Sequence, residues 1–178
     1  MRTKIFALSL MLVLCGSLYP QSLSQLGFII KKAVPDIEVI AVIFGEPAIG
    51  GNKTRQMESE ARPATLITKK KFVLLPCQTR SEIAQKLYEA QKLKKVAFIA
   101  ITDDDIITPS IVQFIAQRAG ESGFPVISNR EKDTLQGALL SIFMQDGKIQ
   151  KHINKIISAA LELTIPEEFL AECKIDAE

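Results

Sequence analysis

The sequence predicts an α/β domain of three layers, in which a mainly parallel sheet lies between helices. Short apolar runs recur along the chain, and segments whose apolar residues have helical spacing separate them. Strands that are buried on both faces are nearly continuous in apolar residues, as these runs are. Because right-handed helical connections join parallel strands, we expect a Rossmann-like lobe, followed by a C-terminal β-hairpin and a helix.

The beginning of the chain is typical of a secretory signal peptide. Arg2 and Lys4 precede an apolar stretch, 5–14, which is too short for a bilayer span of roughly 20 residues. Small residues follow, and they offer two cleavage points, after Ser17 or after Ser24. We therefore expect a protein that is exported, either periplasmic or secreted, and not membrane-spanning after the leader is removed.

Removing the leader changes the charge of the protein. The chain has 22 basic and 20 acidic residues, so losing Arg2 and Lys4 leaves equal numbers of each. A neutral domain has no overall attraction for nucleic acid, which we exclude as a partner. We expect a signal peptide at 1–24 and a single α/β domain at 25–178.

Four apolar runs are the expected strands, and each ends at a polar, small or turn-forming residue. They are residues 37–44, 72–75, 96–101 and 124–127. Two helix starts lie between them. Thr79 and Glu82 have the spacing of a capping box, and Thr108 precedes Pro109, which is favoured at a first helical position.

Residues 46–71 are less clear, because they are polar and contain Gly50, Gly51 and Pro63. Two alternatives remain open for this segment. It holds a short helix near 54–61, or it is a mobile loop.

The C-terminal third begins with an apolar run, 137–144, and an Asp-Gly pair at 146–147 that is typical of a hairpin turn. Residues 148–153 are then the returning strand, and a helix begins near Asn154. The alternative is one helix over 148–163.

No catalytic motif stands out. His152 is the only histidine, and its lysine-rich surroundings favour a solvated position. A GxSxG elbow, an HExxH helix and a CxxC pair are absent from the sequence. We expect a non-enzymatic binding protein without a metal or cofactor.

Polar or small residues follow three strands at the point where each ends. The predicted ligand-binding residues are Gly45, Glu46, Asp103, Asp104, Ser128 and Asn129. Ligands of open parallel sheets bind at the carboxyl ends of strands, and helix N-termini there supply N–H donors for an anionic group. The alternative for the acids is that they only favour the start of the next helix.

Three cysteines are present. Cys15 lies in the leader, where a lipid anchor is a weaker alternative to cleavage. Cys77 and Cys173 permit one disulfide in an exported protein. The alternative is two separate buried thiols.

Several segments resemble one lobe of the ABC transporter substrate-binding proteins, of the type often found near tryptophan-related genes. The matching segments are Asp103–Pro109, Phe124–Ser128, Gly137–Leu140, the ending from Asn154 to Leu170, and the start from Leu26 to Phe44. The resemblance implies a binding protein for a small molecule or a partner. That family has two lobes, and this chain has room for one.

A second resemblance is to the YfiR-type periplasmic regulators. Residues 137–170 are similar to the ending of that family, with an apolar strand, an Asp-Gly turn, a second strand and a helix after Ile153-Asn154. The resemblance implies a regulator that contacts a membrane diguanylate cyclase, and it permits a homodimer.

Overall fold

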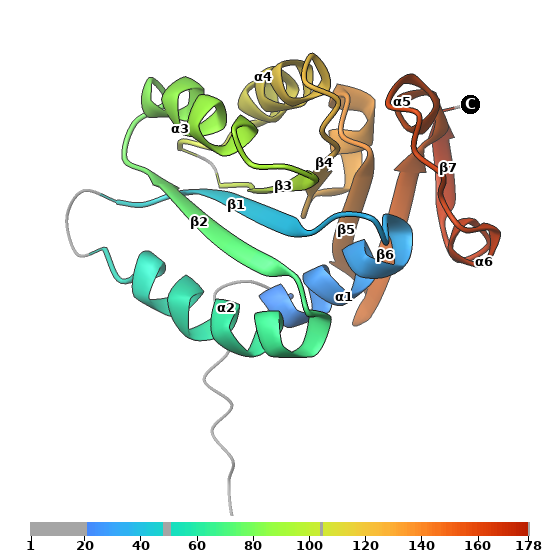
Figure 1. Ribbon diagram of the computed structural model, residues 1–178, viewed down its shortest axis with the longest axis horizontal. Coiled ribbons are helices and arrows are strands. Elements are labelled where there is room, and N and C mark those ends of the chain that lie inside the picture. Colours follow the sequence, from blue (N-terminus) through green and yellow to red (C-terminus); the bar gives the residue numbers. More distant parts are fainter. Residues whose placement is uncertain (1–20, 48–50, 104, 178) are drawn as a thin grey trace, which may run out of the picture.

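The computed structural model describes residues 21–47, 51–103 and 105–177, and it holds a seven-stranded sheet of order β2-β1-β3-β4-β5-β6-β7 (Figure 1). The strands are β1 (Val39–Gly45), β2 (Lys71–Cys77), β3 (Val96–Ile101), β4 (Val126–Ser128), β5 (Leu140–Gln145), β6 (Lys148–Asn154) and β7 (Lys174–Ala177). The helices are α1 (Leu23–Ala33), α2 (Lys53–Thr68), α3 (Glu82–Gln91), α4 (Pro109–Gly120), the 3₁₀ helix η1 (Glu131–Gln136), α5 (Lys155–Ala160) and α6 (Glu167–Leu170).

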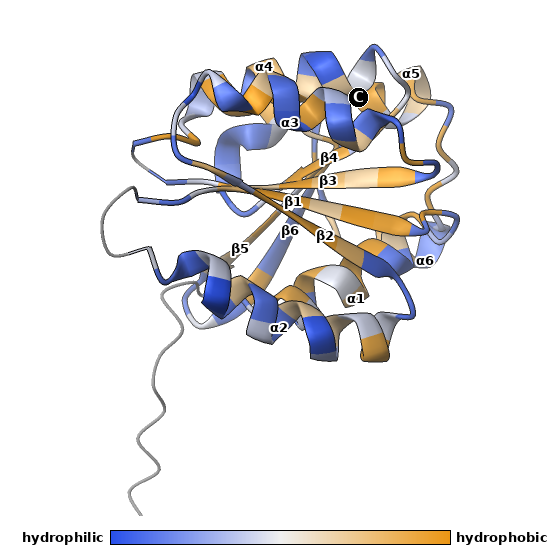
Figure 2. Ribbon diagram, turned by 60° about the vertical axis from the view of Figure 1, so that its left-hand side comes forward, coloured by the Kyte–Doolittle hydropathy of each residue, from blue (hydrophilic) through white to orange (hydrophobic). Residues whose placement is uncertain are grey.

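The predicted fold class is confirmed. Strands β1 to β5 are parallel to their neighbours, β6 returns antiparallel to β5, and β7 runs parallel to β6. Helices α1 and α2 cover one face of the sheet, and α3 and α4 cover the other (Figure 2). The three layers follow from strands that are apolar on both faces.

The central strands show this double burial directly. All six residues of β3 are buried, and alternate side chains enter different cores. Ile99 packs with α1 and α2, whereas Phe98 packs with α3 and α4. The carboxyl ends of β1, β3 and β4 therefore emerge together from one rigid platform.

Helix α2 decides between the two alternatives for residues 46–71. It is a 16-residue helix, longer than the one expected near 54–61, and it contains Pro63. Its buried residues are only Met57, Ala64 and Thr68, so its apolar periodicity is weak in the sequence. The packing of α2 against α1 stabilises a helix that the local sequence does not predict.

One predicted helix start is right and another is wrong. Thr108 is the N-cap of α4 with Pro109 at its first position, as expected. Helix α3 begins only at Glu82, so the capping box with Thr79 as N-cap is not formed. The Glu82 carboxylate instead accepts hydrogen bonds from the Gln78 amide and the Thr79 hydroxyl.

The hairpin is confirmed and the single long helix is excluded. Asp146 and Gly147 have φ of 51° and 73°, the left-handed backbone that a tight hairpin turn requires. Asn154 then caps α5 by accepting a hydrogen bond from the Ile157 amide. Strand β7, which was not predicted, pairs with β6 at the edge of the sheet.

The two described cysteines are free thiols rather than a disulfide. Cys77 is buried in the core beneath α3 and α4, and Cys173 packs against the core on the other face of the sheet. The sheet separates them, so the two thiols are separate as the alternative held, but only Cys77 is buried and Cys173 is half-buried. Burial raises the pKa of each thiol to about 11.

Among the described residues, none of the helices has both the length and the apolar character needed to cross a bilayer.

Candidate functional site

The predicted site residues that the structure describes lie along one edge of the sheet, which we call the carboxyl rim. It comprises Gly45, Glu46, Asp103, Ser128 and Asn129, and Asp104 lies outside the described residues. Parallel pairing in register brings the ends of β1, β3 and β4 side by side. The members of the rim differ in what they contact.

Asp103 is the centre of the rim. Its Oδ1 accepts hydrogen bonds from the backbone amides of Asp105, Ile106 and Ile107, at 3.0, 2.6 and 2.9 Å. These bonds order the loop between β3 and α4. Its Oδ2 faces the end of β1, where a Cβ added to Gly45 would lie only 2.3 Å away. One oxygen thus has a structural role, and the other faces the rim.

Lys53, which was not among the predicted site residues, completes this part of the site. Its Nζ lies 3.8 Å from Asp103 Oδ2, and its ammonium group lies 5.8 Å from the centre of the Phe44 ring. Burial lowers the pKa of Lys53, whereas Asp103 raises it and so opposes the shift. A cation and a carboxylate therefore face each other at the ends of β1 and β3.

Glu46 anchors the neighbouring helix. It is buried, and its Oε2 accepts hydrogen bonds from the Thr54 amide at 2.7 Å and the Thr54 hydroxyl at 2.8 Å. A carboxylate is favourable at the positive end of a helix, so Glu46 holds the start of α2 against β1. Its position also places Lys53 beside Asp103.

Asn129 connects the ends of β3 and β4. Its Oδ1 accepts hydrogen bonds from the Thr102 amide and the Thr102 hydroxyl, both at 2.8 Å. Within the described part of the chain, no hydrogen bond from its amide nitrogen is seen, so this NH₂ group is available to a ligand. Asn129 is half-buried at the surface of the rim.

Ser128 is buried below the rim and faces away from it. Its hydroxyl donates to Asp133 Oδ2, and Arg130 donates through Nε and Nη2 to Asp133 Oδ1, at 3.0 and 2.8 Å. This arrangement holds the Arg130 guanidinium at the surface. Ser128 therefore positions Asp133, and through it Arg130, from below the surface of the rim.

A hollow of about 370 Å³ lies beside these residues, between the start of α4 and η1. It is lined by Pro109, Arg130, Glu131, Lys132, Asp133 and Gln136. Its volume lies within the range of small-molecule sites, which begins near 300 Å³. Arg130, Lys132 and the positive end of α4 favour an anionic group here, whereas the carboxylates of Glu131 and Asp133 oppose it.

The solvated position that was predicted for His152 is wrong. His152 is 6% exposed, and its Nδ1 lies 2.9 Å from Asp176 Oδ2. Thr134 donates to the same oxygen at 2.5 Å, and Phe143 packs against the imidazole ring. Because β7 pairs with β6, a residue 24 positions away becomes the partner of the histidine. This network fastens β7 and η1 to the sheet.

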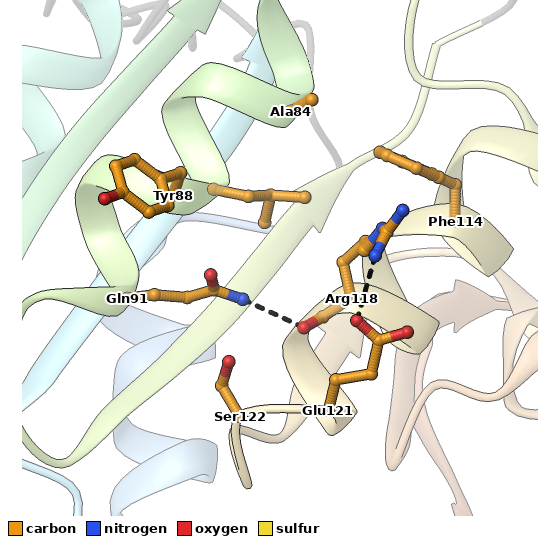
Figure 3. A pocket seen from close by; sticks show the side chains of 8 residues that line it. Ala84, Tyr88, Gln91, Phe114, Arg118, Glu121 and Ser122 are labelled. Atoms are coloured by element: carbon orange, nitrogen blue, oxygen red, sulfur yellow. Dashed lines mark hydrogen bonds and ion pairs between the residues drawn. The ribbon is translucent and has the colours of Figure 1, made fainter.

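A second pocket, of about 280 Å³, lies between α3 and α4 near their C-terminal ends (Figure 3). Its polar groups mostly satisfy one another, since the Gln91 amide donates to the Arg118 carbonyl and Arg118 pairs with Glu121. This pocket lies on a helical face and away from the carboxyl rim. Among the described residues, no group of acidic, histidine and cysteine side chains is arranged to hold a metal ion.

Neither a protein-family model nor a curated protein matches the chain. Three solved structures share its fold. The first is a conserved domain protein from Vibrio cholerae O1 biovar El Tor strain N16961, with a TM-score of 0.72 and 17% identity. The second is an ABC domain from Streptococcus pneumoniae in complex with L-Trp, with a TM-score of 0.71 and 18% identity.

The third is a ligand-free, open substrate-binding protein with adhesive properties from Clostridium difficile, with a TM-score of 0.69 and 14% identity. Each comparison covers 88% of this chain and 60% of the other, so the chain spans about 60% of their length. At these identities the likeness shows the fold alone. The chain has an α/β fold that substrate-binding proteins also have.

Proposed function

We propose that the chain is an exported, non-enzymatic binding protein that holds a small carboxylate-bearing molecule beside the carboxyl rim. The observation that carries the proposal is the hollow next to β4, where Arg130 and the positive end of α4 meet. A guanidinium has five N–H donors, and Asp133 engages two of its nitrogens, which leaves donors for a ligand carboxylate.

The remaining polar groups suit a ligand that also carries an amino group. The Asn129 amide and Asp103 lie along the same rim, so one donor and one carboxylate oxygen face its surface. The structural neighbour that binds L-Trp supports an amino acid as the ligand class.

Export is part of this proposal and rests on the N-terminal pattern. The structure adds an argument about the cleavage point. Ser22 and Gln25 form a capping box at the start of α1, and Leu23 is buried in the core. Cleavage after Ser17 keeps these contacts, whereas cleavage after Ser24 removes two of the three residues. We propose the earlier point.

Thermal unfolding with a library of free amino acids tests the ligand class. A ligand at 100 times its Kd should stabilise the protein by about 2.7 kcal/mol. Arg130→Lys keeps a cation beside Asp133 but loses the planar fork, so it should fold normally and lose at least roughly tenfold in affinity. Arg118→Lys, which lies in the pocket between α3 and α4, is the matched control and should bind as the unaltered chain does.

The proposal fails if no amino acid or related carboxylate raises the melting temperature. It also fails if Arg130→Lys and Arg118→Lys change the affinity for the ligand by the same factor. The alternative function, in which the chain is a regulator that contacts a membrane diguanylate cyclase, stays a prediction. Recovery of such a cyclase together with the protein from membranes would support this alternative.

A further inference from the structure

Three segments that are distant in the sequence meet at the amino ends of the strands, opposite to the carboxyl rim. The Glu38 amide donates to the Lys95 carbonyl at 2.9 Å, and the Lys71 amide donates to the Glu38 carbonyl at 3.0 Å. The Lys70 ammonium reaches back to the Pro35 carbonyl at 2.6 Å. The ends of α1, α2 and α3 are thereby joined into one continuous surface.

This surface, which we call the basic edge, is dominated by lysine. It comprises Lys31, Lys32, Lys69, Lys70, Lys71, Lys92, Lys94 and Lys95. Asp36 and Glu38 are its only acidic residues within the segments 28–38, 66–71 and 92–95. The chain as a whole has 22 basic and 20 acidic residues, so outside these segments 14 basic residues face 18 acidic ones. The chain is therefore nearly neutral as a whole, but the basic edge carries a positive charge and the rest of the chain carries a negative one.

The crowding of these cations is visible in their contacts. Burial lowers the pKa of Lys70, and the nearby charge of Lys31 lowers it further. Lys95 pairs with Glu38 at 2.5 Å, which leaves an excess of positive charge at the surface. Helix C-termini favour cations, so three helix ends with a common direction gather lysines in one place.

Exposed apolar side chains lie beside the basic edge on α1 and α2. Leu66 is 70% exposed, Ile67 is 57% exposed and Phe28 is 47% exposed. A Cβ added at Gly27 would lie 3.1 Å from Thr68 Cγ2, so the two helices touch at the residues next to Phe28 and Ile67. Scattered exposed apolar residues are ordinary, but these three lie near the C-terminal ends of two helices in contact, and each is within about a turn of a lysine of the basic edge.

We propose that the basic edge and these apolar side chains dock the protein onto an anionic lipid bilayer. Lysines attract an anionic surface from a distance, and adjacent apolar side chains enter the boundary of the acyl chains. The composition favours lipid over other anionic partners. Interfaces with proteins are depleted in lysine, and bidentate recognition of phosphate uses arginine, which the basic edge lacks.

The docking geometry is compatible with ligand binding but does not depend on it. The basic edge and the carboxyl rim lie at opposite ends of the parallel strands. A protein that rests on a bilayer through the basic edge would hold the hollow beside Arg130 away from the membrane. The two proposals can therefore fail separately.

The absence of tryptophan from the sequence permits a test with a site-specific reporter in the full chain. Ile67→Trp places the reporter in the proposed contact. Leu135→Trp, at a residue of η1 that is 62% exposed, is the matched control. Vesicles that contain phosphatidylglycerol should shift the emission of Ile67→Trp to the blue and leave Leu135→Trp unchanged, whereas phosphatidylcholine vesicles should affect neither.

Charge variants in the Ile67→Trp background test the lysines. Each lysine near an anionic surface contributes roughly fivefold to affinity, so Lys32→Gln, Lys69→Gln and Lys71→Gln together should weaken vesicle binding about a hundredfold. The same loss of charge at Lys132, Lys148 and Lys174 is the control and should weaken it by much less. Added salt should weaken binding of the unaltered chain.

Three results would overturn the proposal. One is the absence of a blue shift for Ile67→Trp with anionic vesicles, and another is an equal shift for both reporters. The third is a response of Ile67→Trp to duplex DNA or to an acidic polypeptide without a response to vesicles. Circular dichroism of each variant before the titration establishes that it is folded.

Discussion

Gly45→Ala tests whether the close approach of β1 to Asp103 matters for the fold of the rim. The new Cβ would lie 2.3 Å from Asp103 Oδ2, and 3.1 and 3.2 Å from Cβ and Cδ1 of Ile106. Asp103 cannot simply turn away, because its Oδ1 holds three backbone amides. Overpacking of this kind costs about 1–3 kcal/mol. At roughly 2–4 °C per kcal/mol for a domain of this size, the melting temperature should fall by roughly 2–12 °C.

Thermal and urea unfolding measure this effect, and Gly120→Ala is the control. A Cβ at Gly120 meets nothing within 4 Å and lies in a helix, so alanine there should be neutral or stabilise by up to about 1 kcal/mol. A double-mutant cycle then isolates the carboxylate. In an Asp103→Ala background, the Gly45→Ala substitution should cost at least about 1 kcal/mol less. An equal cost in both backgrounds would refute the reasoning, as would a Gly45→Ala protein as stable as Gly120→Ala.

Two further predictions concern the N-terminus and the cysteines. A chain that begins at Gln25 should be less stable to urea than one that begins at Leu18, by about 2–4 kcal/mol, because it lacks the helix cap and the buried Leu23. Equal stabilities would show that α1 does not need its first turn. Cys77 and Cys173 should each take one alkyl group in denaturant without a reductant. In the folded protein, their pKa of about 11 keeps the thiolate scarce, so alkylation should be slow at neutral pH and accelerate roughly tenfold per pH unit as the pH rises toward 11. A pH-independent rate would contradict this, and so would a mass that shows a disulfide.

The elements that the sequence predicted correctly are those with a strong local cause. The run 96–101 is apolar at every position, and a strand inside a parallel sheet needs that pattern. Thr108 and Pro109 start α4 because proline is preorganised for the first helical turn. The Asp-Gly pair at 146–147 forms a hairpin turn because both residues accept a left-handed backbone.

The elements and contacts that were missed depend on partners elsewhere in the chain. Helix α2 has few apolar residues, and its stability comes from α1, so the segment did not predict a helix of its full length. Lys53 belongs to the candidate site because Glu46 binds the start of α2 beside β1. His152 is buried because β7 supplies Asp176, and no local pattern indicates which acid would pair with it.

The sequence by itself determined the layers, the direction of most strands and the positions at which polar residues leave the sheet, because apolar periodicity and turn chemistry are local properties. Only the tertiary structure decided which of those residues stay at the surface of the rim. Asp103 and Asn129 remain at the surface of the rim. Ser128 instead turns inward to Asp133, and the Glu46 carboxylate accepts hydrogen bonds from the start of α2. It also decided that lysines from three separate segments form one surface. Such pairings depend on which atoms meet after folding, and that depends on contacts between residues far apart in the chain.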